Sequence, residues 1–265
     1  MEQEQEKPVK AKEDSTIEQL YQHHFSPQVY VSEFYSEIDL EEEFFLSNIH
    51  EFFESVPSFL CTMPRIVVEI GSGPIISGLV SASRWADLLV YSDLLPSNCD
   101  HILSSLSSPG PAIKTIARLE DSAPHLVLTR LLTKPVLVTE SNLFSRPVLP
   151  HLGFGTKPCI VLAKLCIEFA VTELEQFWSV LQNIAALLDT HGVFVCMGAL
   201  NESYYMLGKK KFPAFALTKE LMNTGLEKAG MEMVLWKEVE RSSNPEQKPT
   251  GHSGLYFMYA RKTKC

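Results

Sequence analysis

The chain has 265 residues, of which 45% are hydrophobic, and a formal net charge of -9. This length and apolar content suit one large α/β domain with its own core. The negative charge, with no cationic run longer than residues 209–211, excludes the phosphate backbone of a nucleic acid as a natural partner.

The sequence also lacks the usual marks of export or membrane insertion. Its N-terminus is charged and has no apolar segment of the kind found in signal peptides. No apolar run is long enough to span a bilayer, and the six cysteines contain no CxxC pair. We therefore expect a reduced, cytoplasmic, monomeric protein that binds neither membrane nor nucleic acid.

The N-terminal segment divides into a polar tail and an aromatic arm. Residues 1–14 are nearly all Glu, Gln and Lys, so they cannot bury enough apolar surface to offset the entropy lost on ordering. We expect a disordered tail there and a single domain over residues 15–265. Ser15 can cap a short helix that runs through Tyr21. Residues 21–35 contain three tyrosines, which is unusual for a core segment because each buried phenol needs a hydrogen-bond partner.

Residues 38–55 carry apolar side chains at helical spacing beside an acidic face. This pattern predicts an amphipathic helix that packs on a sheet. Glu41, Glu42 and Glu43 belong to the acidic face, so we expect all three to be solvated.

Residues 65–74 form the centre of the sequence pattern. Apolar residues surround Glu69, which is typical of a parallel strand buried on both faces. Gly71 and Gly73 follow, and paired glycines allow a tight turn with a ligand close to backbone N–H groups. Residues 75–82 can then begin a helix. A strand, a glycine turn and a helix form the nucleotide-binding corner of a doubly wound sheet.

The type of nucleotide is indicated by what this corner lacks. Ile76 replaces the third glycine of the dinucleotide fingerprint, and no Gly-Lys-Ser/Thr sequence is present to make a P-loop. A second acid, Asp93, ends the apolar run of residues 88–91, where a carboxylate can accept hydrogen bonds from both ribose hydroxyls. These features favour S-adenosylmethionine (SAM). A tight turn that binds no ligand is the alternative interpretation.

Strands and helices continue to alternate along the rest of the chain. No third strand is readable between Asn98 and Thr133, a stretch rich in Ser and Pro. After it, the patterns predict a fourth strand at residues 135–140, a helix over 171–188, a strand over 193–197, a helix over 217–229, and an antiparallel edge hairpin of 231–239 and 254–260.

Several motifs resemble those of the small-molecule N-methyltransferases that include the nicotinamide, phenylethanolamine and indolethylamine enzymes. Residues 24–35 are similar to that family's His/Arg-Phe-x-Pro-x-x-Tyr-x-x-x-x-Tyr arm, and residues 69–74 to its Asp-Ile-Gly-Ser-Gly-Pro turn. Residues 198–208 resemble its Gly/Asp-Ala-Leu-x-x-Ser-Trp/Tyr-Tyr-x-x-Gly motif, and residues 159–168 its fifth strand with the motif that follows. The resemblance covers about residues 21–261.

The resemblance implies one class I methyltransferase domain of Rossmann-like α/β fold, with a mostly parallel seven-stranded sheet and helices on both faces. It also implies SAM as cofactor, no metal, and an N-terminal arm over residues 15–60 that closes as a lid. The candidate catalytic residues are Glu168 and Glu202, which would hold the substrate nitrogen and accept its proton, with Tyr205 nearby. The positions that correspond to cofactor contacts are Tyr30, Tyr35, Gly71, Ser72, Gly73, Ser77, Asp93, Asn98, Glu140, Ser141 and Lys164.

Four positions depart from the family pattern. Ser77 stands where members usually have a tyrosine. Lys164 stands where a small residue or Thr is usual, although a cation beside a sulfonium is unfavourable. Gly198 and Ala214 stand where the nicotinamide enzyme has an Asp and a Ser, the polar anchors of its amide.

Two functions are compatible with these residues. The first is SAM-dependent transfer of a methyl group to a small-molecule amine, because the missing anchors disfavour nicotinamide and the acids favour a basic nitrogen. The second is a catalytically impaired relative that binds SAM or a protein partner without methylating. Ser77, Lys164 and the short third-strand region would be explained by that alternative.

Overall fold

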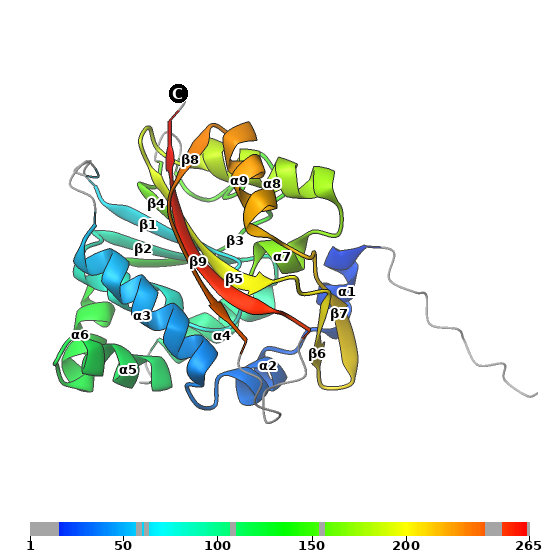
Figure 1. Ribbon diagram of the computed structural model, residues 1–265. Coiled ribbons are helices and arrows are strands. Elements are labelled where there is room, and N and C mark those ends of the chain that lie inside the picture. Colours follow the sequence, from blue (N-terminus) through cyan, green and yellow to red (C-terminus); the bar gives the residue numbers. More distant parts are fainter. Residues whose placement is uncertain are drawn as a thin grey trace, which may run out of the picture.

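The computed structural model describes residues 16–56, 60, 64–106, 110–153, 157–241 and 251–263. A twisted sheet runs through the middle of the molecule, and helices cover both of its faces (Figure 1). The predicted tail over residues 1–14 and the predicted cap at Ser15 lie outside the described residues.

The main sheet has seven strands in the order β3-β2-β1-β4-β5-β9-β8. The first five strands in this order are parallel, and β9 is antiparallel to both β5 and β8. β1 (Ile66–Ile70) is central and buried along its whole length, as the apolar run around Glu69 predicted. The predicted fold class is therefore confirmed. The other strands are β2 (Leu88–Asp93), β3 (Val136–Glu140), β4 (Ile160–Lys164), β5 (Val193–Leu200), β8 (Met231–Glu240) and β9 (Gly254–Lys262).

The numbering of the strands differs from the prediction. Residues 135–140, expected to be the fourth strand, contain the third strand, β3, and the strand after Cys159 is the fourth. The described residues between Asn98 and Thr133 form helices instead of a strand. Each of these helices begins with a proline, whose missing N–H is not needed in a first turn. The sheet is complete, so this region shows no truncation; its helices are α4 (Pro96–Ser105), α5 (Pro111–Leu119) and α6 (Pro124–Thr133).

Helices on the two faces of the sheet enclose two separate hydrophobic cores. Val67 of β1 belongs to the core beneath α3 (Leu40–Glu54), and Val68 belongs to the core beneath α8 (Leu174–Leu187) and α9 (Lys219–Lys228). Neighbouring side chains of a strand point to opposite faces, which explains this division. The helices predicted over 38–55, 171–188 and 217–229 are thus confirmed with shorter bounds.

The helix predicted over residues 75–82 is wrong in type. The chain forms two 3-10 turns there, η1 (Ser77–Leu79) and η2 (Ser81–Arg84). Gly78 lies so close to the end of β1 that a Cβ on it would be 2.1 Å from Glu69 Oε1. Serine and glycine are poor helix formers, and packing against Glu69 decides the path of the segment.

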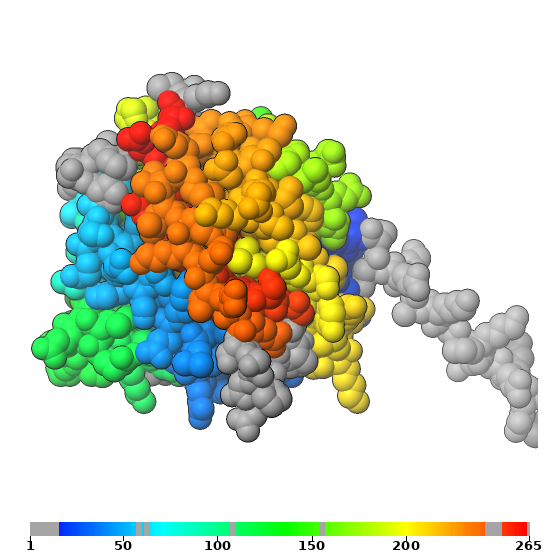
Figure 2. Space-filling model, viewed as in Figure 1, coloured from blue at the N-terminus to red at the C-terminus, as the bar shows by residue number. Residues whose placement is uncertain are grey.

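The aromatic arm lies over the carboxyl ends of the parallel strands. It consists of α1 (Ile17–His24) and α2 (Pro27–Phe34), whose caps are Thr16 and Ser26. The arm packs on a hairpin that the sequence analysis did not identify, formed by β6 (Tyr204–Leu207) and β7 (Lys210–Pro213) (Figure 1). In the space-filling view, this hairpin lies beside the segment that leads into β9 (Figure 2). The aromatic contacts between arm and hairpin connect Tyr21, Phe25, Phe34, Tyr205 and Phe212.

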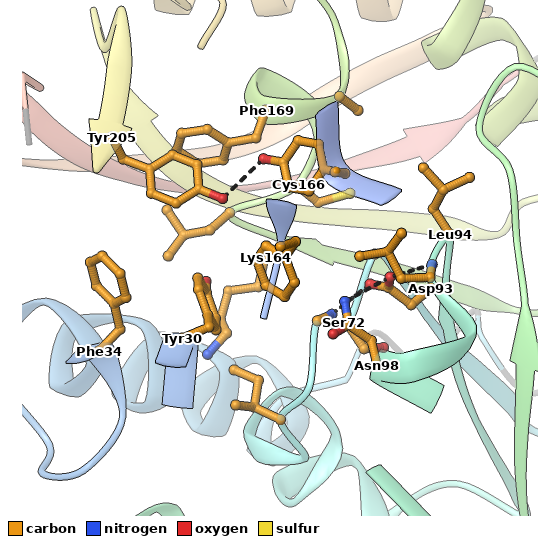
Figure 3. A pocket seen from close by; sticks show the side chains of 18 of the residues that line it. Tyr30, Phe34, Ser72, Asp93, Leu94, Asn98, Lys164, Cys166, Phe169 and Tyr205 are labelled. Carbon is orange, nitrogen blue, oxygen red and sulfur yellow. Dashed lines mark hydrogen bonds between the residues drawn. The ribbon is translucent and has the colours of Figure 1, made fainter. Parts of the chain in front are cut away.

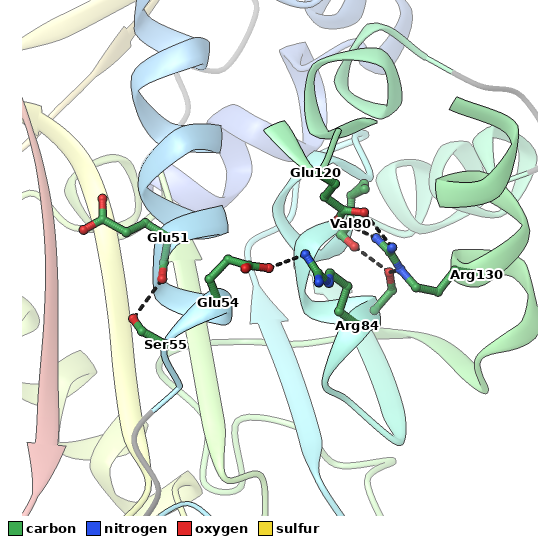
Figure 4. Close-up of polar contacts among 8 residues, drawn as sticks. Glu51, Glu54, Ser55, Val80, Arg84, Glu120 and Arg130 are labelled. Carbon is green, nitrogen blue, oxygen red and sulfur yellow. Dashed lines mark hydrogen bonds and ion pairs between the residues drawn. The ribbon is translucent and has the colours of Figure 1, made fainter. Parts of the chain in front are cut away.

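Two arginine–glutamate pairs beside α3 and α6 differ in burial (Figure 4). Arg130 binds Glu120 through two hydrogen bonds of 2.7 Å each, and the Glu120 side chain is 4% exposed. Arg84 pairs with Glu54 at the surface, where both side chains are more than 40% exposed. Removing a partner from a buried carboxylate leaves its desolvation uncompensated, whereas an exposed pair contributes little.

We therefore expect Arg130→Ala to lower the free energy of unfolding by about 2–3 kcal/mol. The matched variant Arg84→Ala should lower it by less than about 1 kcal/mol. Urea denaturation of both variants measures the difference. Equal effects of the two substitutions would contradict the argument from burial.

Candidate active site

The glycine turn after β1 makes room for a ligand. Gly71 and Gly73 both have φ of +61°, in the left-handed region that favours glycine. A Cβ on Gly71 would lie 2.1 Å from Cys166 Sγ, whereas a Cβ on Gly73 would meet only Tyr30, at 3.9 Å. The N–H of Ser72 donates to Ser92 O, and that of Gly73 donates to Asp93 Oδ2. These two donors are used within the fold, so the turn supplies space for a ligand and not the free backbone N–H groups that the sequence suggested.

Asp93 lies at the carboxyl end of β2 and connects three loops. Its Oδ1 accepts hydrogen bonds from Leu95 N and Asn98 Nδ2, and its Oδ2 accepts the bond from Gly73 N, all within 2.8–2.9 Å. Burial raises the pKa of Asp93, and these hydrogen bonds oppose that rise. Asn98 Oδ1 is buried without a partner among the described residues. One acceptor therefore remains open beside the carboxylate.

A pocket extends from this turn to the aromatic arm (Figure 3). Residues at the ends of β1, β2, β3, β4 and β5 line it, so it lies at the carboxyl edge of the sheet, where ligands bind in open α/β folds. Most of the residues singled out from the sequence are brought together here. Those that line the pocket are Tyr30, Tyr35, Gly71, Ser72, Gly73, Asp93, Asn98, Ser141, Lys164, Glu202 and Tyr205.

Lys164 of β4 is neutralised by a partner that the sequence analysis expected to be solvated. Its Nζ donates to both carboxylate oxygens of Glu42, at 2.7 and 2.8 Å, and to Ser77 Oγ at 2.7 Å. The side chains of Lys164 and Glu42 are 2% and 4% exposed. The expectation that Glu41, Glu42 and Glu43 all face solvent is therefore wrong for Glu42.

Ser77 and Glu140 do not line the pocket. Ser77 is buried, and its hydroxyl accepts the hydrogen bond from Lys164. Glu140 is exposed at the end of β3, and the chain turns so that Ser141 faces the pocket instead. Strand alternation explains the second difference, because neighbouring residues point to opposite sides.

Glu168 also lies outside the pocket lining. It is fully buried in α7 (Ile167–Ala170), and its Oε1 accepts a hydrogen bond of 2.8 Å from Ala199 N. A Cβ on Gly198 would be 1.9 Å from the same oxygen, so Gly198 provides the space that Glu168 occupies. The carboxyl expected to hold a substrate nitrogen therefore lies behind the pocket wall, with its Oε2 lacking a partner among the described residues. Ala214 does not line the pocket either.

Glu202 is the buried acid that reaches the pocket. It follows β5, is 2% exposed, and has an Oε1 without a partner in the described structure. Burial raises the pKa of Glu202 to about 7, an effect that nearby His252 and a backbone hydrogen bond from Gly251 partly offset. The acid can therefore change its protonation state near neutral pH.

Aromatic rings form the opposite wall of the pocket. Tyr205 packs edge-on against Phe34 and Phe169, and its hydroxyl donates to Tyr21 at 3.2 Å (Figure 3). The hydroxyls of Tyr30 and Tyr35 hydrogen-bond to each other. Such a wall can contact the apolar part of a ligand, while the Glu202 carboxylate contacts the ligand's polar group.

Sequence reasoning missed two further pocket residues, Glu41 and His252. His252 Nε2 lies 3.0 Å from Glu41 Oε1, although the two residues are far apart in the chain. The partner of Lys164 could have been anticipated, because a lysine inside an apolar strand requires a buried acid. Nothing near His252 indicated its role. Among the described residues, no three His, Cys, Asp or Glu side chains are grouped so as to hold a metal ion.

Comparison with known sequences gives a consistent result. A sequence model of the NNMT/PNMT/TEMT family matches residues 13–263. Nicotinamide N-methyltransferase of Homo sapiens is 27% identical over 93% of this chain and 96% of that protein. Indolethylamine N-methyltransferase of Oryctolagus cuniculus is 29% identical, over 91% and 95%. Phenylethanolamine N-methyltransferase of Sus scrofa is 25% identical, over 75% and 73%.

Solved structures share the fold at low sequence identity. A SAM-dependent methyltransferase from Methanosarcina mazei superposes with a TM-score of 0.54 and 12% identity, over 77% of this chain and 95% of that one. The CcbJ methyltransferase from Streptomyces caelestis has a TM-score of 0.54 and 11% identity, over 91% and 100%. No helix in the described part of the chain has the length and apolar character needed to cross a membrane.

The buried carboxyl of Glu168 makes stability depend on pH. Burial raises its pKa from 4.5 to about 8, so between these values the folded protein keeps a proton that the unfolded chain has lost. The free energy of unfolding therefore falls as the pH rises from about 4.5 to about 8. Glu168→Gln removes this contribution. The free energy of unfolding of the variant, relative to that of the wild type, should therefore be higher at about pH 8.5 than at about pH 5. Urea denaturation at both values measures this gain, and an equal stability difference at the two values would contradict it.

Proposed function

The chain belongs to the NNMT/PNMT/TEMT family and is a SAM-dependent N-methyltransferase, and we propose that its substrate is a small molecule with a basic amine. The relatives named above act on nicotinamide, indolethylamine and phenylethanolamine. The observation that carries the proposal is the buried carboxylate of Glu202, whose Oε1 has no partner among the described residues, in an aromatic pocket.

The residues around the glycine turn fit the cofactor. SAM supplies an activated methyl group on a positively charged sulfur. We propose that Gly73 and Ser72 border its amino-acid part, while Asp93 and the open Asn98 Oδ1 accept hydrogen bonds from its hydroxyl or amine donors. Ser141 completes this side of the pocket.

The arm would act as a lid over the same site. Tyr30 and Tyr35 project from α2 and its C-terminal cap into the pocket, and the arm is held by the aromatic contacts with the β6–β7 hairpin. A filled pocket gives these side chains additional contacts, so closure favours a bound ligand. We propose that α1 and α2 close in this way. The predicted lid over residues 15–60 was too long, because α3 packs in the hydrophobic core and is held to β4 by the pair of Glu42 and Lys164.

The ion pair of Lys164 and Glu42 makes the pocket compatible with a cationic cofactor. The lysine alone would repel a sulfonium, but the carboxylate brings the local charge to zero. Ser77, which replaces the expected tyrosine, supplies the third acceptor of the ammonium. The two departures therefore compensate each other and give no support to an impaired relative.

Glu202 would hold the substrate nitrogen and accept its proton. An amine is protonated in water and must lose a proton before its lone pair can attack the methyl carbon. A carboxylate with a pKa of about 7 is matched to that task at neutral pH. Tyr205 and the aromatic wall would position the rest of the molecule, which places the nitrogen toward the acid. Nicotinamide has no basic amine and would leave this carboxylate unpaired.

The test is a competitive methylation assay of benzylamine, 2-phenylethylamine, tryptamine and a straight-chain alkylamine against nicotinamide. We expect an amine to be preferred, with kcat/KM rising through about pH 7 as Glu202 loses its proton. In Glu202→Gln, activity should fall by about 10- to 100-fold and the rise near pH 7 should disappear. Glu175→Gln, on the exposed face of α8, is the matched control. A preference for nicotinamide would refute the amine assignment.

A second prediction concerns the charge balance at Lys164. In Glu42→Gln the lysine loses its counter-charge, and one uncompensated charge about 8 Å away costs about 2 kcal/mol at an effective dielectric constant of 20. We expect calorimetry to show weaker SAM binding, by about 30-fold relative to binding of the uncharged thioether S-adenosylhomocysteine. The double variant Glu42→Gln/Lys164→Met should restore the ratio. Equal losses for both ligands would show that the pair acts on structure and not on charge.

A further inference from the structure

At the substrate end of the pocket, two polar atoms have no partner among the residues that the structure describes. They are Glu202 Oε1 and His252 Nδ1, both buried, on residues that line the same pocket. An unsatisfied buried polar atom costs free energy, and in a native protein it requires an explanation. Their common location indicates that a ligand or a transferred proton meets both of them.

The backbone holds His252 beside Glu202. Ser253 N donates to Leu200 O at 2.8 Å, and Asn201 Nδ2 donates to Ser253 Oγ at 2.9 Å. The backbone of Gly251 hydrogen-bonds to the Glu202 carboxylate. The residues on both sides of His252 are therefore attached to the loop that carries Glu202.

The hydrogen bond between His252 and Glu41 determines the state of the imidazole. A carboxylate is an acceptor, so Nε2 carries the hydrogen that it donates to Glu41 Oε1, 3.0 Å away. In the neutral ring, Nδ1 then bears a lone pair and can accept a proton. Glu41, in the first turn of α3, is 27% exposed, whereas His252 is 3% exposed. Of the two acids on either side of His252, Glu202 is therefore enclosed and Glu41 is in contact with water.

We propose that His252 and Glu41 form a proton relay that carries the substrate's proton from Glu202 to solvent. The inference rests on the proposed amine methylation. The ammonium first gives one proton to the Glu202 carboxylate. The free lone pair then forms the N–CH₃ bond, while the electron pair of the broken S–CH₃ bond stays on sulfur. Glu202 Oε1 and His252 Nδ1 share no direct hydrogen bond, so a water molecule between them would carry the proton from Glu202 to Nδ1. Nε2 passes its own proton to Glu41, and Glu41 releases it to water. Rotation of the ring then returns the remaining hydrogen to the side of Glu41, so one proton leaves in each turnover.

Several other charged groups lie near the relay. Arg241, at the end of β8, lowers the pKa of Glu202, and Glu41 raises it. Lys164 lines the same pocket but is neutralised by Glu42. Asp39 caps α3 and accepts from Glu42 N.

The first test needs no substrate. In the full-length protein labelled with ¹⁵N-histidine, we expect the neutral His252 ring to show the Nε2–H tautomer, assigned by loss of its signals in His252→Gln. Glu41→Gln should shift these signals, whereas Glu43→Gln, which removes a charge from the same helical turn, should not. A ring with its hydrogen on Nδ1 would overturn the relay.

The second test uses the amine that the methylation panel selects. Glu41→Gln and His252→Gln should lower kcat by about 10- to 100-fold, with little change in the affinity for S-adenosylhomocysteine. In His252→Ala, added imidazole should restore activity, and stronger diffusible bases should restore more. His125 is exposed on α6, and His125→Gln should behave as the wild type. A change in KM alone, or no rescue by imidazole, would overturn the relay while leaving amine methylation standing; failure of every amine would refute the proposed function instead.

Discussion

The balance of charge inside a closed pocket is the constraint on which this structure depends. Lys164 is nearly fully buried at the end of β4, and removing an ammonium from water costs several kcal/mol unless a counter-charge meets it. Glu42 supplies that charge from α3, the helix that follows the aromatic arm. The pair therefore attaches α3 to the sheet. It also removes the net charge from the part of the pocket where a cationic cofactor must bind.

Some polar groups of the pocket have hydrogen-bond partners within the fold, and others have none among the described residues. At the cofactor end, the Asp93 carboxylate accepts three hydrogen bonds from the fold, whereas Asn98 Oδ1 and both carboxyl oxygens of Glu69 have no partner among the described residues. At the other end, Glu202 and His252 keep atoms without partners. A polar atom left open in a buried site costs stability, and this cost is tolerated where the atom has work to do in binding or proton transfer.

The fold and the cofactor end were predictable from the sequence because they depend on local patterns. The apolar run of residues 66–70, the paired glycines and the acid at Asp93 are each readable within one strand and its turn. The ion pair beside the cofactor and the substrate end were not readable, since both depend on contacts between distant segments. Glu42 pairs with Lys164 across more than 120 positions, and Glu41 meets His252 across more than 200. Glu168 matched a motif by spacing, but its helix directs the carboxyl behind the wall.

The departures from the family pattern follow one physical logic. Ser77 Oγ accepts from Lys164, which in turn binds Glu42, so the three residues form one network in which no member can change alone without cost. Gly198 and Glu168 form a second such set, because a side chain at Gly198 would occupy the position of the Glu168 carboxyl. When one such position is compared with the family motif by itself, the comparison shows only a lost contact. Considered together with its neighbours, the position shows an exchanged contact, and Lys164 keeps a balanced charge through Glu42 and Ser77.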